Sequence, residues 1–273
     1  MLTEKQFDTG EAMINYAEGD TDGPPLLVLH GATVNWQTMG DIFPSLEKHW
    51  HLYAPDFRGH GKSGWRTTGY RLVDYVPDVT LFIERIIGQP TVVVGFSLGA
   101  KVAMQVPARL PKLTRAIVLL EPALILWDAG IRSLPETYEW VLQNHEILSS
   151  SRTPEERMAH IKRLMPDLDE AGLQFHLDRI NGLDPAVLTP LLEDRLIDSF
   201  NLEEVLTKVA CPAMLVYGEF ATGGVVRDSD AALLKAYVPH ARIFQVKGAP
   251  HWVFVSPFTS VVMEQVNDFL ESV

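Results

Sequence analysis

Short runs of uninterrupted apolar residues alternate along the chain with longer stretches in which apolar residues recur every three or four positions. The short runs are typical of strands buried on both faces, and the wider spacing is typical of helices with one buried face. The predicted strands are residues 12–16, 26–29, 51–54, 92–94, 116–120, 213–217 and 243–246. This alternation predicts an α/β fold with a mostly parallel sheet and helices on both faces. We expect the first of these strands to belong to an antiparallel edge.

One segment interrupts the alternation. Residues 123–198 contain no convincing strand, and their apolar residues follow helical spacing near 136–148, 154–164 and 170–180. A helical insert after the sixth strand is expected to form a lid over the carboxyl edge of the sheet, where open α/β folds bind ligands. The sequence therefore predicts a core made of residues 1–122 and 199–273, with the lid inserted between them.

The candidate nucleophile lies in the motif Gly95-Phe96-Ser97-Leu98-Gly99. A β-branched strand precedes the motif at 91–94, and helix-forming residues follow it at 100–105. A G-x-S-x-G motif between a strand and a helix is typical of a nucleophile elbow, which exposes the serine hydroxyl on a tight turn. We therefore interpret Ser97 as a nucleophile. The amide of Leu98, at the start of the helix, is expected to bind an oxyanion.

Two further segments lie where an acyl-transfer site needs them. His251 follows the last predicted strand in Gly248-Ala249-Pro250-His251, so its imidazole is the candidate base that activates the serine. His30-Gly31-Ala32 follows an earlier strand, and the amide of Ala32 is the candidate second oxyanion donor. We expect His30 itself to be structural.

The chain is identified as a member of the α/β-hydrolase superfamily by the order of four motifs. These are His30-Gly31, Asp56-Phe57-Arg58-Gly59-His60-Gly61-Lys62-Ser63, the G-x-S-x-G motif and Gly248-Ala249-Pro250-His251. The resemblance covers nearly the whole chain outside the predicted lid. It implies an eight-stranded sheet, a Ser–His–acid triad and no cofactor.

The acid of the triad departs from the commonest pattern of the family. Many members carry an aspartate three residues after the glycine that ends the seventh strand, but here Gly218 is followed at that distance by Ala221. Other members carry the acid after the sixth strand, where this chain has Glu121. We interpret Glu121 as the acid, with Asp228 and Glu219 as the alternatives.

Charge and composition exclude several other classes of protein. The net charge of −12 and the scattered Lys and Arg residues argue against nucleic acid or an anionic membrane as partner. Cys211 is the single cysteine, so no internal disulfide is possible, and no set of His, Cys and acidic residues has metal-ligand spacing. The first residues are too polar for a targeting segment, and no apolar run reaches the roughly 18 residues of a membrane span. We expect a cytoplasmic protein without a metal.

These observations predict a serine hydrolase that cleaves a small hydrophobic carboxylic ester or lactone through an acyl-enzyme. Tryptophans are expected to help build its pocket, with Trp127 and Trp252 as the best candidates. Glu121, together with Val255-Ser256-Pro257 after the histidine, also resembles the fungal lactone hydrolases that open zearalenone. The alternatives are a carbon–carbon bond hydrolase of the meta-cleavage type and a small-molecule receptor with little turnover. The sequence leaves the oligomeric state open.

Overall fold

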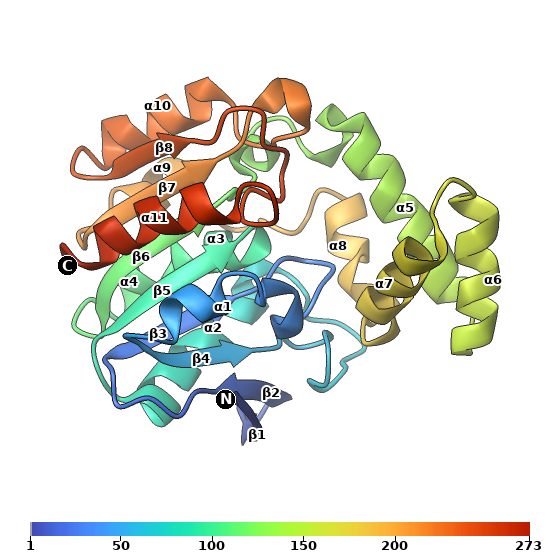
Figure 1. Ribbon diagram of the computed structural model, residues 1–273, viewed down its shortest axis with the longest axis horizontal. Helices are drawn as coiled ribbons and strands as arrows, with labels where there is room; N and C mark the ends of the chain where they lie inside the picture. The colour runs from blue at the N-terminus through green and yellow to red at the C-terminus, as the bar shows by residue number, and fades with distance from the viewer. Residues whose placement is uncertain (1) are drawn as a thin grey trace.

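The computed structural model describes residues 2–273 and contains one eight-stranded sheet (Figure 1). The strand order is β1-β2-β4-β3-β5-β6-β7-β8. β1 and β2 pair antiparallel with each other and β2 pairs antiparallel with β4, while the remaining pairs are parallel. The strands are Thr3–Asp8 (β1), Met13–Glu18 (β2), Pro25–Leu29 (β3), His51–Pro55 (β4), Thr91–Phe96 (β5), Thr114–Leu120 (β6), Ala213–Tyr217 (β7) and Arg242–Gln245 (β8). The mostly parallel sheet and its antiparallel edge are therefore confirmed.

Burial explains why the central strands read as continuous apolar runs. Alternate residues of β5 point to opposite faces of the sheet, so that Val93 belongs to one hydrophobic cluster while Val92 and Val94 belong to the other. Both clusters are closed by helices, so every residue of β5 is buried. β1 lies at the edge with five of its six residues exposed, and its polar sequence gave no strand pattern.

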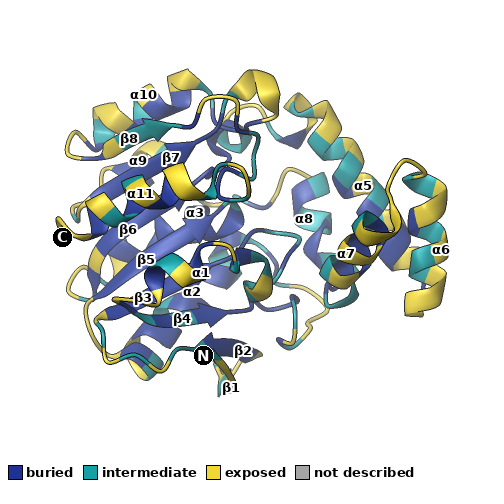
Figure 2. Ribbon diagram, viewed as in Figure 1, coloured by how far each residue is buried: buried dark blue, intermediate teal, exposed yellow. Residues whose placement is uncertain are grey.

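Helices cover both faces of the sheet (Figures 1 and 2). One set of helices closes the cluster that contains Val93, and another closes the cluster that contains Val92. On the first face lie α2 (Leu72–Phe82), which continues as a π-helical turn (Ile83–Ile87), α3 (Leu98–Ala103), α4 (Val106–Arg109), α9 (Leu202–Leu206) and α10 (Asp228–Tyr237). On the second lie α1 (Phe43–Leu46) and α11 (Thr259–Leu270), together with the short turn Trp36–Met39.

Residues 121–212, all of which the structure describes, contain helices and loops but no strand. Two of the helices begin with side-chain caps, since Thr153 and Glu156 form a capping box at α6 and Asp169 accepts a bond from the Gly172 amide at α7. Besides α9, the helices are α5 (Pro135–Ser150), α6 (Pro154–Leu164), α7 (Glu170–Asn181) and α8 (Thr189–Leu192), with single 3₁₀ turns at Leu124–Trp127, Ile131–Ser133 and Pro185–Val187. Figure 1 shows α5 to α8 beside one end of the strands. The three expected helical stretches are confirmed.

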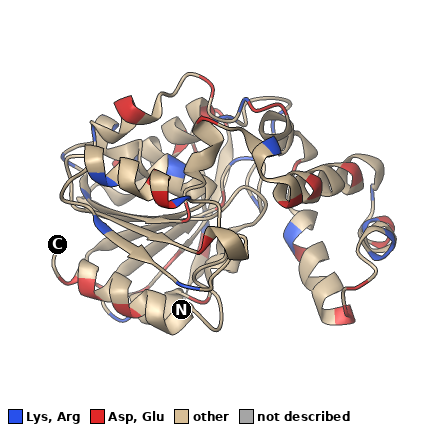
Figure 3. Ribbon diagram, turned by 90° about the horizontal axis from the view of Figure 1, so that it is seen from above, with Lys and Arg blue, Asp and Glu red and all other residues tan. Residues whose placement is uncertain are grey.

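Charged residues of both signs are interspersed over the molecule (Figure 3). Within residues 2–273, no helix combines the length and the apolar composition needed to cross a lipid bilayer.

Candidate active site

Ser97 lies on the turn between β5 and α3 with φ 51° and ψ −107°, a strained backbone for a residue other than glycine. The glycines on either side of it let the strand and the helix approach closely. A Cβ on Gly95 would lie 2.3 Å from the Gly99 carbonyl oxygen, and one on Gly99 would lie 2.2 Å from the Leu29 carbonyl oxygen. The turn therefore depends on both glycines.

Backbone hydrogen bonds hold this turn against the neighbouring strands. The Ser97 amide donates to the Leu120 carbonyl at 2.9 Å, and the Gly99 amide donates to the His30 carbonyl at 3.0 Å. Leu98 is the first residue of α3, where a backbone N–H has no acceptor within the helix. Its position beside Ser97 is the one expected of an oxyanion donor.

His251 lies in the loop after β8, and its Nδ1 is 3.1 Å from Oε2 of Glu121. The Glu121 side chain is fully buried and accepts two further bonds, from the amides of Gly218 (2.6 Å) and Val225 (2.8 Å). Glu121 itself has a positive φ of 48°, which turns the chain sharply at the end of β6. Three donors thus fix the orientation of one carboxylate.

The two alternative acids are bonded to other groups. Asp228 accepts from the Tyr217 hydroxyl and from the Gln245 amide, each at 3.1 Å. Glu219 accepts from the Gly248 amide at 2.9 Å. Of the three carboxylates considered, the structure places Glu121 against the imidazole.

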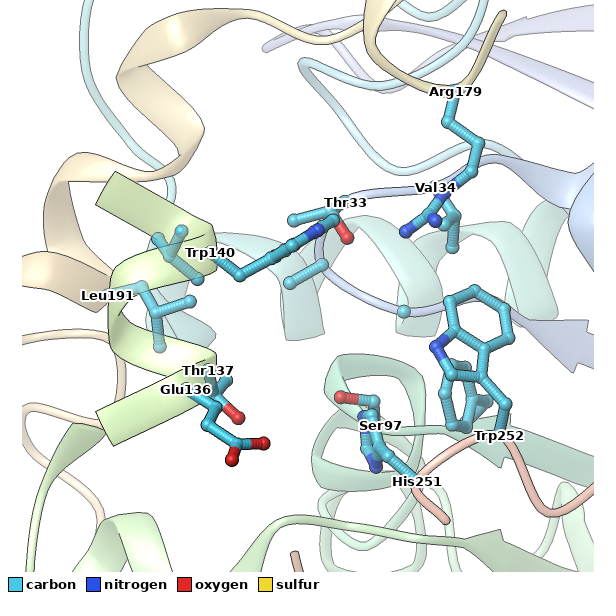
Figure 4. Close-up of a pocket in the computed structure, with 14 residues that line it drawn as sticks. Thr33, Val34, Ser97, Glu136, Thr137, Trp140, Arg179, Leu191, His251 and Trp252 are labelled. Carbon is cyan, nitrogen blue, oxygen red and sulfur yellow. The ribbon is translucent and has the colours of Figure 1, made fainter. Parts of the chain in front are cut away.

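Ser97, His251 and Ala32 line one cavity of about 330 Å³ (Figure 4). Its volume is in the range of small-molecule sites, and most of its lining side chains are apolar. The other lining residues are Gly31, Thr33, Val34, Phe96, Glu136, Thr137, Trp140, Val141, Arg179, Leu191 and Trp252. The cavity is therefore built both by the loops at the end of the sheet and by helices α5, α7 and α8.

Of the two tryptophans expected in the pocket, one lines the cavity and the other does not. Trp252 lines the cavity and packs against Phe96, with ring centres 5.1 Å apart. The expectation for Trp127 is wrong, since this residue does not line the cavity that contains Ser97. The 3₁₀ turn after β6 directs its indole toward Phe200, to whose carbonyl Nε1 donates at 3.3 Å, and it borders a separate pocket with Arg227.

Glu136 and Arg179 were missed by the sequence reasoning. Both lie on helices for which the spacing of apolar residues predicts only the buried face. Neither residue belongs to a recognisable motif. No signal in the sequence places a particular residue of α5 or α7 over the end of the sheet.

The chain belongs to the α/β-hydrolase family. A family model described as alpha/beta hydrolase fold matches residues 24–257. The 2-(acetamidomethylene)succinate hydrolase of Mesorhizobium japonicum is 32% identical to this chain over 277 residues, which cover 98% of this chain and 95% of that protein. The fold and its relatives place the chain among the hydrolases.

Solved structures show the same fold. The crystal structure of an E-2-(acetamidomethylene)succinate hydrolase superposes with a TM-score of 0.77 and 21% identity, covering 99% of this chain and 100% of that one. The N-formylmaleamic acid deformylase of Pseudomonas putida S16 also superposes with a TM-score of 0.77, at 17% identity and with 97% and 100% of the two chains covered.

Proposed function

We propose that this hydrolase cleaves the acyl bond of a small carboxylic ester or lactone through an acyl-enzyme formed on Ser97. The observation that supports this most directly is the hydrogen bond between His251 and the buried Glu121, at a cavity that Ser97 also lines. A serine on a strained turn, an imidazole and a carboxylate are the three parts that activate a hydroxyl nucleophile.

In the proposed first step, Ser97 Oγ attacks the substrate carbonyl carbon while Nε2 of His251 takes the hydroxyl proton. Glu121 accepts the Nδ1 proton of the imidazole, which fixes the tautomer and stabilises the imidazolium. The amides of Leu98 and Ala32 bind the oxyanion that forms on the carbonyl oxygen. His251 then gives the proton to the leaving oxygen, and the carbon–oxygen bond breaks.

The second step releases the acid. A water molecule gives a proton to His251 and attacks the acyl carbon. The resulting tetrahedral intermediate collapses as His251 returns the proton to Ser97 Oγ, which releases the carboxylic acid and the free enzyme. Every proton moves through one imidazole, so no metal or cofactor is needed for the proposed chemistry.

An amide is the second candidate substrate. The relative with 32% identity over nearly the whole chain is named for a substrate that carries an acetamido group. The same steps hydrolyse an amide when His251 protonates the leaving nitrogen before the carbon–nitrogen bond breaks.

The helical segment 123–198 is proposed to act as a cap on a core of residues 1–122 and 199–273. Residues of α5, α7 and α8 supply one side of the cavity, opposite to Ser97 and His251 (Figure 4). A cap in this place would exclude bulk water from the reacting carbonyl.

Release of p-nitrophenol from acetate, butyrate and octanoate esters tests the proposal. We expect turnover in the wild type and in the control variant Ser229→Ala, whose serine is exposed on α10, and none above background in Ser97→Ala. A p-nitroanilide of the preferred acid tests the amide candidate. Turnover that survives in Ser97→Ala would overturn the assignment of the nucleophile. A folded wild type that binds these substrates without turnover would favour a receptor, and one that cleaves only a vinylogous diketone would favour carbon–carbon hydrolysis.

A further inference from the structure

A single arginine side chain reaches the cavity from the helical segment. Arg179 lies in the last turn of α7 and lines the cavity together with Trp140 and Trp252. Figure 4 shows its guanidinium reaching down toward the space that Ser97 and His251 face from below. Among the described lining residues, it is the only arginine or lysine.

Arg179 has aromatic neighbours but no acidic partner. Its guanidinium carbon lies 5.3 Å from the ring centre of Trp140, 5.0 Å from that of Trp252 and 5.5 Å from that of Phe175. Within residues 2–273, no carboxylate forms an ion pair with it, and its Nε is buried without a hydrogen-bond acceptor. Burial lowers the pKa of Arg179 to about 10, so the side chain stays charged at neutral pH.

The neighbouring titratable groups leave this charge uncompensated. Burial, reinforced by the Arg179 charge, lowers the pKa of His176 to about 4, and the neutral imidazole is bonded to Asn144 at 2.9 Å. Asp178 accepts a bond from Gln174 at 2.7 Å. Glu136, on α5, lines the cavity without pairing with Arg179. The cavity therefore has one cationic position and one separate anionic position.

An unpaired guanidinium in an apolar cavity is costly to bury unless an anion joins it. Its planar set of N–H donors matches the two oxygens of a carboxylate. A single cation balances one carboxylate, whereas a phosphate dianion would leave a negative charge unpaired in the cavity. We propose that Arg179 binds a carboxylate of the substrate, so that the substrate is a small acyl compound carrying a second, anionic acid group. This inference rests on the proposed function, because it places the scissile carbonyl at Ser97.

Two p-nitrophenyl esters of equal chain length test the inference. In the valerate ester the acyl chain ends in a methyl group, and in the glutarate monoester it ends in a carboxylate. We expect the wild type to favour the glutarate monoester, and Arg179→Gln to lower kcat/KM for that ester by about 10- to 100-fold, as expected for the loss of a hydrogen bond to a charged group. The valerate ester should keep its kcat/KM. Arg179→Lys should recover part of the preference, because it restores the charge without the fork of donors.

A second arginine variant shows whether the change in ester preference depends on an arginine inside the cavity. Arg163→Gln removes an exposed charge from α6, outside the cavity, and should leave the ratio of the two kcat/KM values unchanged. A ratio that is the same in the wild type and in Arg179→Gln, with turnover still dependent on Ser97, would overturn the inference and leave the proposed function standing.

Binding tests the inference without turnover. Tryptophan fluorescence of Ser97→Ala, in which Trp140 and Trp252 flank Arg179, should respond to glutarate and not to its neutral isostere glutaramide. The response should disappear in the double variant Ser97→Ala/Arg179→Gln. If Ser97→Ala binds glutarate in this way but the wild type hydrolyses neither ester, the result contradicts the proposed function and leaves the carboxylate site standing. An equal response to both ligands, or no response to glutarate, would contradict the carboxylate site.

Discussion

The imidazole of His30 bonds to the carbonyl of Gly31, the next residue in the chain, at 2.7 Å from Nδ1. Nε2 of the same ring accepts the Phe57 amide at 2.9 Å, so the ring proton must lie on Nδ1. Complete burial lowers the pKa of His30 well below its ordinary value, which keeps the ring neutral and in this tautomer. The Gly31 carbonyl and the Ala32 N–H belong to one trans peptide and point in opposite directions. By holding the carbonyl, His30 fixes the direction of the proposed oxyanion donor.

His30→Phe should therefore lower kcat by about 10- to 100-fold with little change in KM, because a misdirected donor weakens binding of the transition state and not of the substrate. His30→Asn should retain more of kcat, since its amide can donate from about the position of Nδ1. Steady-state kinetics on a p-nitrophenyl ester, with active-site titration to count folded enzyme, measures the effect. A rise in KM at constant kcat would show that His30 acts on the substrate site in another way.

Glu121→Gln should lower kcat by about 10³-fold or more, because the amide no longer stabilises the imidazolium and disturbs the tautomer of His251. The matched variants Asp228→Asn and Glu219→Gln should stay close to the wild type, since neither carboxylate contacts the imidazole. The three kcat values, measured on one ester, decide between the acids. Near-wild-type activity in Glu121→Gln together with a large loss in Asp228→Asn would reverse the assignment.

Gly99→Ala should prevent folding or destabilise the protein by several kcal/mol. Its Cβ would overlap the Leu29 carbonyl oxygen at 2.2 Å, and the next nearest atoms, the Leu29 carbonyl carbon at 2.6 Å and the His30 carbonyl oxygen at 2.7 Å, are also backbone and cannot move away easily. Gly88→Ala is the control, because its φ of 65° is also unfavourable for alanine but its Cβ would meet nothing within 4 Å. That variant should lose only about 1–2 kcal/mol. Urea unfolding of both variants measures the difference, and equal losses would contradict the steric explanation.

Lys101 is buried in α3, one turn beyond Ser97, and burial lowers its pKa to about 7, with the Glu121 charge opposing the shift. Between pH 7 and its ordinary pKa of 10.5, the unfolded chain binds more protons at this group than the folded chain. The stability of the wild type should therefore rise with pH relative to Lys101→Met, by at most about 1.4 kcal/mol per pH unit. Urea unfolding at pH 7, 8 and 9 measures the free energies of both proteins. Parallel pH dependences would show that Lys101 keeps its proton in the folded state.

Local signals made Ser97 and His251 predictable, since each lies beside a strand end in a short motif whose backbone geometry is fixed by nearby glycines or a tight loop. Glu121 was predicted from the resemblance to family members that carry the acid after the sixth strand, and the structure places it there beside His251. β1 was missed because an exposed edge strand has no apolar alternation. Arg179 was missed because its place at the cavity depends on how α7 packs beside the end of the sheet, and no local pattern encodes that position. Trp127 was misplaced because no local pattern encodes the direction in which the 3₁₀ turn after β6 points its indole.

The carboxylate of Glu121 connects the carboxyl ends of β6 and β7, the two strands between which the helical segment is inserted. Glu121 follows β6, while its donors Gly218 and Val225 follow β7, on the far side of the segment. The position of the acid is thus set by residues that flank the segment and not by the segment itself. For protein engineering, the proposed cap of residues 123–198 should therefore be exchangeable: another helical cap inserted between β6 and β7 would bring its own substrate contacts in place of Arg179 and leave the histidine–carboxylate pair intact.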